Sequence, residues 1–140
     1  MNRHEQREQV FKLLFRDEFH TAQEMDQQVK LFFEDEELSG ISEKDMEYIA
    51  QKHEKIREKL AELDKLLDEK AENWKVSRMG KVELTVLRLA LYEMIYDEEV
   101  PEGAAINEAV EIAKTYGQES SGSFVNAVLA KFVKQGDSNS

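Results

Sequence analysis

The sequence predicts an all-α protein, a single-domain bundle of about seven helices. Along most of the chain, hydrophobic residues recur at spacings of three and four, which is the period of a helix, and no segment alternates apolar and polar residues as a half-buried strand does. One proline and six glycines leave little material for the many turns of an all-β fold. A length of 140 residues, with 41% hydrophobic and 35% charged residues, fits one globular domain.

The N-terminal half predicts three helices. The first has its apolar stripe at Val10, Phe11, Leu13, Leu14, Phe15 and Phe19. Thr21 and Glu24 have the spacing of a capping box at the start of a second helix. Ser42 is placed to cap a third, long helix over residues 43–71, whose seam is Met46, Ile49, His53, Ile56, Leu60, Leu63 and Leu67. We expect His53 to be a packed, hydrogen-bonded histidine rather than a metal ligand.

The C-terminal half predicts three more helical segments. After an irregular join in which Trp74 packs, residues 81–96 are apolar on most sides, so this helix should lie centrally. Residues 97–103 contain the only proline and predict a loop, and residues 105–116 predict a helix that ends at a left-handed Gly117. The last helix carries Phe124, Val125, Val128, Leu129 and Phe132. The domain is expected to span residues 1–134, followed by a frayed polar tail at 135–140.

Several classes of function are disfavoured by what the sequence lacks. There is no cysteine for a disulfide, thiol nucleophile or zinc site, and His4, His20 and His53 have no metal-ligand spacing. Neither a complete phosphate-binding loop nor a G-x-S-x-G nucleophile motif occurs. We therefore expect no enzymatic activity, no cofactor and no metal. Without a signal peptide or a long apolar run, the chain is expected to be soluble and cytoplasmic, with no membrane partner.

Charge is distributed unevenly along the chain. The net charge is −11, which at first argues against a nucleic-acid partner. Residues 1–16, however, contain four basic residues against two acidic ones, which leaves −13 for the rest of the chain. Arg3, His4 and Arg7 can share one helix face and bind phosphates or bases, although an ordinary amphipathic helix start has the same composition.

A second candidate site precedes the last helix. Residues 117–123 are rich in glycine and serine, and their hydroxyls and backbone amides could hold a phosphate. Phe124 could offer a face for base stacking, although a core phenylalanine at a helix start is the commoner case.

Three blocks of the C-terminal half closely resemble the NusB family of transcription antitermination factors. They are VELTVLRLALYEMIY (82–96), VPEGAAINEAVEIAKTYG (100–117) and SGSFVNAVLAKF (121–132), and REQVFKLLF (7–15) resembles the family's first helix. The resemblance spans about residues 3–133. It implies two packed helical subdomains that bind the boxA element of ribosomal RNA leaders, usually with the ribosomal protein NusE. The resulting complex helps RNA polymerase to read through terminators.

The resemblance also implies roles for single residues. Arg3, His4 and Arg7 match the family's basic RNA-binding motif, and Ser120 and Phe124 match its second RNA-contacting patch. Positions used towards NusE are matched by Phe15 and Glu83, with Arg88 nearby. His4 stands where some members carry another arginine, which should affect affinity more than function. The sequence leaves open a purely protein-binding helical adaptor, and also whether the free protein forms a homodimer.

Overall fold

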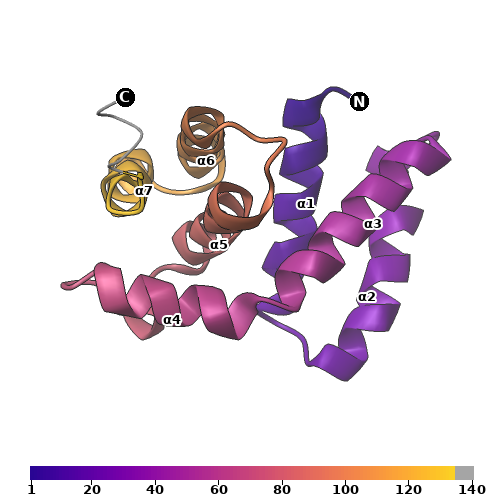
Figure 1. The fold of residues 1–140 in the computed structure, drawn as a ribbon. Coiled ribbons are helices and arrows are strands. Elements are labelled where there is room, and N and C mark those ends of the chain that lie inside the picture. Colours follow the sequence, from indigo (N-terminus) through magenta and orange to yellow (C-terminus); the bar gives the residue numbers. More distant parts are fainter. Residues whose placement is uncertain (135–140) are drawn as a thin grey trace. The chain divides into compact units, whose positions relative to one another are not determined.

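The computed structural model describes residues 1–134 and confirms the all-α prediction (Figure 1). This part of the chain forms seven α-helices and two short 3-10 helices, and it contains no strand. It divides into two compact units, the N-terminal unit up to Glu58 and the C-terminal unit from Lys59 onwards. The predicted frayed tail at 135–140 lies outside the described residues.

The N-terminal unit is built from three α-helices whose starts are fixed by side-chain caps. Its elements are α1 (Arg3–Asp17), α2 (Ala22–Glu34), η1 (Glu36–Leu38) and α3 (Glu43–Arg57), and α1 packs against both α2 and α3. Thr21 and Glu24 form the predicted capping box, and the Ser42 hydroxyl accepts from the Asp45 backbone N–H at 3.1 Å.

A cluster of three polar side chains, of which His53 is buried, joins α1 to α3. His53 is 1% exposed, and its Nε2 lies 2.6 Å from Asp17 Oδ2. Arg57 Nε lies 3.3 Å from the other carboxylate oxygen of Asp17. This confirms His53 as a packed, hydrogen-bonded histidine, because its partner is a carboxylate from the facing helix.

The prediction of a single long helix over 43–71 is wrong, because the chain leaves helical geometry at Lys59. Lys59 has φ −108° and ψ 3°, and a new helix, α4 (Leu60–Lys70), begins after it. Ile56 and Leu63 are fully buried on either side of the break. The apolar spacing therefore predicted correctly which residues are buried, but it did not show that the helix is interrupted. Neither glycine nor proline marks the break, which lies where the chain passes from one unit to the other.

The C-terminal unit surrounds one apolar helix. Its elements are α4, η2 (Val76–Arg78), α5 (Lys81–Tyr96), α6 (Glu102–Tyr116) and α7 (Ser121–Ala130). Within this unit α5 packs against α4, α6 and α7, and its residues from Leu84 to Met94 are buried except for Arg88. The predicted central place of this helix is confirmed for its own unit (Figure 1).

The start of α6 and the backbone conformation at its end differ from prediction. α6 already begins at Glu102, with Pro101 as its N-cap, so Gly103 lies in the first helical turn and not in a loop. Gly117 ends α6 as expected but is extended, with φ −100°, and is not left-handed. A side chain is excluded there by space, because a Cβ would come within 2.5 Å of Ser121 Oγ.

The predicted core is mostly confirmed, with two aromatic exceptions. Phe19 is 56% exposed and Trp74 is 42% exposed, although both were expected to pack inward. Phe19 donates its backbone N–H to the Arg16 carbonyl just beyond the end of α1, so it no longer follows the apolar stripe of that helix.

Among residues 1–134, no helix is long and apolar enough to cross a membrane.

Candidate nucleic-acid interface

The basic start of α1 is set by a capping box that the sequence analysis missed. The Asn2 side chain accepts from the Glu5 backbone N–H at 2.8 Å, and Glu5 Oε1 accepts from the Asn2 backbone N–H at 3.0 Å. The helix therefore begins at Arg3, and Arg3 and Arg7 lie one turn apart. At about 100° per residue their directions differ by only about 40°, so they share a face.

The three predicted RNA-binding residues of α1 differ in their surroundings. Arg3 is exposed, and its side chain forms no hydrogen bond or ion pair with any described residue. His4 is half-buried, with Nε2 4.0 Å from Glu8 Oε1. Arg7 is only 9% exposed and is engaged within the protein. The guanidinium of Arg3 is thus accessible and makes no contact of this kind in the described chain, whereas that of Arg7 is held within the protein.

The remaining cations of α1, Lys12 and Arg16, do not extend this patch. Arg16 points about 180° away from Arg7 on the helix. It donates to Gln28 Oε1 at 3.1 Å, and its guanidinium carbon lies 5.3 Å from the centre of the Phe32 ring. Lys12 Nζ lies 3.9 Å from Glu37 Oε2. The four basic residues of the segment 1–16 are therefore divided between two faces of α1.

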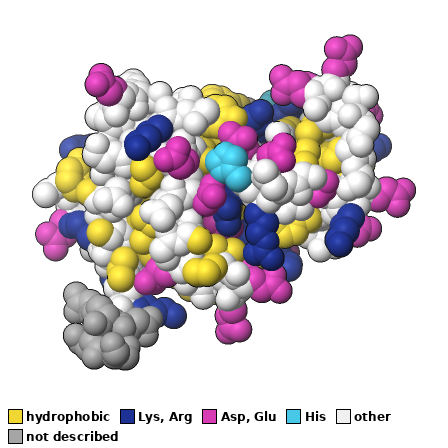
Figure 2. All heavy atoms as spheres, turned by 90° about the horizontal axis from the view of Figure 1, so that it is seen from above, with side chains coloured by type: hydrophobic (Ala, Val, Ile, Leu, Met, Phe, Trp, Pro, Cys, Tyr) yellow, Lys and Arg dark blue, Asp and Glu magenta, His cyan; other side chains and the backbone are white. Residues whose placement is uncertain are grey.

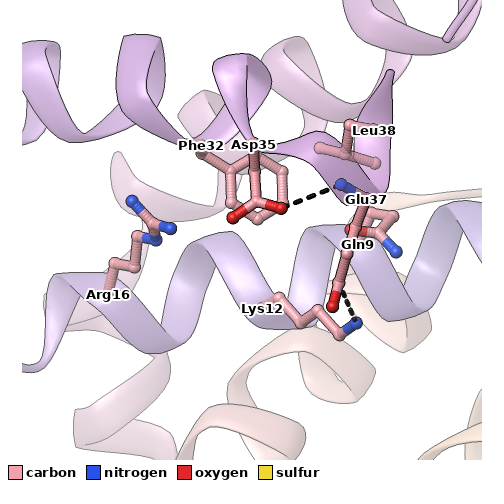
Figure 3. Close-up of a pocket in the computed structure, with 7 residues that line it drawn as sticks. All are labelled: Gln9, Lys12, Arg16, Phe32, Asp35, Glu37 and Leu38. Carbon is pink, nitrogen blue, oxygen red and sulfur yellow. Dashed lines mark hydrogen bonds and ion pairs between the residues drawn. The ribbon is translucent and has the colours of Figure 1, made fainter. Parts of the chain in front are cut away.

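A small hollow of about 120 Å³ lies on this second face (Figure 3). Figure 3 shows Lys12 directed at Glu37, while Asp35 accepts from the Glu37 backbone N–H at 2.9 Å. Gln9, Phe32 and Leu38 complete the lining. Two acidic side chains face the two cations here, so a phosphate would meet repulsion as well as attraction.

Another carboxylate holds the start of α1 against the start of α3. Asp45 Oδ1 accepts from Gln6 Nε2 at 2.8 Å, and Oδ2 lies 3.1 Å from the Met1 ammonium group. The hydrogen bond from Gln6, followed by that from the ammonium group, lowers the pKa of Asp45 below its ordinary range. Gln6 and the Met1 ammonium group thus hold the start of α1, which carries Arg3, against Asp45 of α3.

The C-terminal unit contains an open hollow of about 460 Å³ beside the start of α7. We call it the Trp74–Phe124 hollow; it is lined by Trp74, Arg78, Met79, Gly80, Glu83, Gln118, Ser120, Ser121 and Phe124. The half-buried Phe124 ring meets Trp74 edge to face, with 5.5 Å between centroids and 83° between planes. Ser120 is exposed at the N-cap of α7, and its carbonyl accepts from the Phe124 backbone N–H at 3.1 Å.

This geometry separates the two interpretations of Phe124. The ring lies in the wall of an open hollow, which favours a contact residue over a core residue. Ser120 and Phe124, predicted as one RNA-contacting patch, lie in the same hollow. Trp74 and Arg78, which sequence reasoning did not select, lie there too. The only tryptophan of the chain beside basic residues was the signal that could have identified this segment.

Glu83 joins the same hollow and was assigned to another surface by resemblance. The Ser121 hydroxyl donates to Glu83 Oε2 and accepts from the Gln118 backbone N–H at 2.8 Å. Gly80 leaves the necessary space, because a Cβ there would collide with the Glu83 carboxylate. The carboxylate therefore fixes the start of α7 relative to α5.

The other two residues assigned to NusE also have internal contacts. Arg88 makes a bidentate interaction with Asp64, donating from Nε at 2.8 Å and from a terminal nitrogen at 2.7 Å, and so joins α5 to α4. In the N-terminal unit, the half-buried Phe15 lies next to Phe11 and Phe19, with centroids 6.0 and 5.2 Å away. Phe15 and the exposed Phe19 form an accessible aromatic pair.

Charged side chains of both signs are interspersed on the surface. Figure 2 shows this on one face, where basic and acidic side chains alternate with hydrophobic patches. In residues 1–134 no three histidine or acidic residues are grouped so that they could hold a metal ion.

Comparison with known proteins gives a consistent result. The model of the NusB family matches residues 4–134. The transcription antitermination protein NusB of Lachnoclostridium phytofermentans is 47% identical over 133 residues, covering 95% of this chain and 99% of that protein. The protein of the same name from Agathobacter rectalis is 48% identical over 132 residues, covering 94% and 99%.

Solved structures agree with the sequence comparison. T. maritima NusB superimposes with a TM-score of 0.84 at 36% identity, covering 96% of this chain and 92% of that one. A structure of antitermination factors NusB and NusE in complex with dsRNA gives a TM-score of 0.75 at 25% identity, covering 93% and 96%. The chain belongs to the NusB family.

Proposed function

We propose that this chain is a transcription antitermination factor that binds the boxA RNA of ribosomal RNA leaders together with NusE. The observation that carries the proposal is the family match over residues 4–134, which runs through both units and includes every proposed RNA-contacting residue except Arg3. A structural relative at 25% identity was solved with NusE and dsRNA. Such a factor would work in the bacterial cytoplasm as part of the RNA polymerase antitermination complex.

The residues proposed to contact RNA form two separate groups, Arg3, His4 and Arg7 in the N-terminal unit and Ser120 and Phe124 in the C-terminal unit. Arg3 is exposed and without a partner among the described residues, so its guanidinium can bind a phosphate without breaking a contact. Phe124 presents part of its ring to an open hollow, and Ser120 adds an exposed hydroxyl. An acidic chain can bind RNA in this way because local cations and stacking act at short range.

The residues proposed to contact NusE are Phe15 in the N-terminal unit and Glu83 and Arg88 in the C-terminal unit. Phe15 is the strongest of these candidates, since it is half-buried beside the exposed ring of Phe19. Glu83 is partly exposed, but its carboxylate accepts a hydrogen bond from Ser121. The Arg88 guanidinium donates to Asp64 and is therefore already engaged within the unit. A net charge of −11 suits a basic ribosomal protein as partner.

A binding titration tests the proposal. Fluorescently labelled boxA-containing RNA and a scrambled RNA of equal composition are titrated with the full chain, with and without NusE. We expect preference for boxA RNA that increases when NusE is present. If NusE binds but boxA is not preferred, the chain is instead a protein-binding helical adaptor. Sedimentation of the free chain over a range of concentrations shows whether it forms a homodimer.

The NusE surface is tested by calorimetry with two variants. Phe15→Ala should weaken NusE binding, because an aromatic ring is a frequent anchor of an interface. Glu83→Lys should weaken it as well, and Ser121→Ala serves as the control that breaks the internal hydrogen bond without reversing a charge. Unchanged NusE affinity in both Phe15→Ala and Glu83→Lys would show that this surface is assigned wrongly.

A further inference from the structure

We infer that the Trp74–Phe124 hollow holds one unstacked RNA base, with Trp74 as a second aromatic contact and Arg78 as the cation for the adjacent phosphate. The inference rests on the proposed function and deepens it, because it names the part of the RNA that this hollow takes. Neither Trp74 nor Arg78 is among the residues that the sequence predicted to contact RNA.

The shape of the hollow fits a flat ring. Trp74 and Phe124 meet at 83°, so their rings form the two walls of a corner. A base that stacks on one ring would present its edge to the other. Trp74 is 42% exposed although it is the largest aromatic side chain of the protein. Single-stranded RNA supplies bases that can leave the stack and bind aromatic side chains in this way.

The polar groups of the hollow fit the rest of a nucleotide. The side chains of Trp74, Arg78, Gln118 and Ser120 form no hydrogen bond or ion pair with another residue in 1–134. All four can donate hydrogen bonds, and phosphate and base edges supply acceptors. The single carboxylate in the lining, Glu83, accepts from Ser121 and forms no ion pair with Arg78 within the described chain.

The segment that carries Trp74 and Arg78 is held in place before RNA arrives. Asp68 at the end of α4 accepts from the Val76 backbone N–H at 2.8 Å, and its carbonyl oxygen lies 3.3 Å from Lys75 Nζ. On the opposite wall, the bond between Ser121 and Glu83 fixes the start of α7. Both walls are therefore held by helices of the same unit, so the hollow loses less conformational entropy when a ligand binds.

The single tryptophan makes the inference directly measurable. The full chain with NusE is titrated with boxA-containing single-stranded RNA while Trp74 emission and RNA anisotropy are recorded together. We expect emission to be quenched in parallel with binding. The same RNA annealed to its complement should bind more weakly and leave emission unchanged, because its bases stay paired.

Variants distinguish the loss of base stacking on Trp74 from the loss of any exposed apolar side chain. Trp74→Ala should lower affinity by about 5- to 150-fold, and Trp74→Phe should retain most of it. Ile95→Ala is the matched control, since Ile95 is apolar, 44% exposed and in the same unit. The RNA affinity of this variant should equal that of the unsubstituted chain. Arg78→Ala should reduce the slope of log affinity against log salt by about 0.7. Lys65→Ala removes the same charge from an exposed position of α4 and should leave that slope unchanged.

The outcomes distinguish this inference from the proposed function. If boxA RNA binds but Trp74 emission and the Trp74→Ala affinity stay unchanged, the base lies elsewhere and only the inference is overturned. If boxA RNA does not bind even with NusE, both are overturned. Equal affinity of single-stranded and duplex RNA, with equal quenching, would also contradict an unstacked base.

Discussion

The Ser121 hydroxyl donates a hydrogen bond to the Glu83 carboxylate and thereby joins the first turns of α7 and α5. Ser121 is 2% exposed, and the same hydroxyl accepts from the Gln118 backbone N–H. Two glycines, Gly80 and Gly117, leave the space that the pair occupies. Ser120 and Phe124 stand next to this bond, so their positions depend on it.

Removing the Ser121 hydroxyl should destabilise the protein. Ser121→Ala leaves a carboxylate oxygen and a backbone N–H without their partner, so we expect the free energy of unfolding to fall by about 1–3 kcal/mol. Urea denaturation followed by circular dichroism measures the change. Ser123→Ala is the control, because Ser123 is exposed on the same helix and should change stability little. Equal stability of the two variants would show that the bond to Glu83 contributes nothing.

The His53 cluster of the N-terminal unit gives a second stability prediction. His53→Ala removes a fully buried ring and leaves Asp17 with Arg57 alone, so we expect a loss of about 2–4 kcal/mol. Thermal and urea unfolding provide the measurement, with Gln51→Ala on the exposed side of α3 as control. A loss no greater than that of the control would contradict the role of His53 as a link between α1 and α3.

Asp45 gives a prediction about pH. Its pKa is lowered in the folded state, chiefly by the Gln6 amide, so its contribution to stability is present above the unfolded pKa and is lost as pH falls through the lowered folded value. Carbon-13 NMR titration should therefore place the pKa of Asp45 below the ordinary range of about 4. Gln6→Ala should raise it. If that substitution leaves the titration curve in place, the hydrogen bond is not the main cause.

Arg3 and Arg7 should respond differently to substitution. Arg3→Ala should weaken boxA binding and reduce the salt slope by about 0.7, because one phosphate contact is lost. The melting temperature should not change, since Arg3 is exposed and has no partner in the described chain. Arg7→Ala should lower both affinity and melting temperature, because Arg7 is buried.

The exposed Lys30 of α2 provides the charge-matched control for Arg3. Lys30→Ala removes one positive charge from the same unit and should leave the salt slope unchanged. A salt slope reduced equally by Arg3→Ala and Lys30→Ala would mean that net charge, and not the start of α1, governs RNA binding.

Sequence reasoning located most of the helices because apolar periodicity follows burial. The alternation around Ile56 and Leu63 remained correct for burial even though the helix breaks between them. The break itself carries no glycine or proline, so only tertiary contacts reveal it: Asp17 holds the end of α3, and Arg88 holds α4 through Asp64.

Which site residues lie side by side was predictable only for those on a single helix. Arg3 and Arg7 are one turn apart in sequence, so their shared face follows from helical geometry. The Trp74–Phe124 hollow combines segments about fifty residues apart, and no local pattern states that Trp74 meets Phe124. The glycine- and serine-rich residues 117–123 and Phe124 were a candidate site from the sequence itself, and family resemblance supported Ser120 and Phe124. The resemblance placed Glu83 on another surface and could not show its bond to Ser121.

Ultraviolet crosslinking followed by mass spectrometry tests the proposed RNA surface most directly. The full chain and NusE are bound to boxA-containing RNA, irradiated and digested, and the crosslinked peptides of the chain are identified. The account predicts crosslinks in two regions, the start of α1 around Arg3 and the start of α7 around Phe124, both absent with scrambled RNA. Crosslinks confined to other helices, or equally frequent with scrambled RNA, would contradict it.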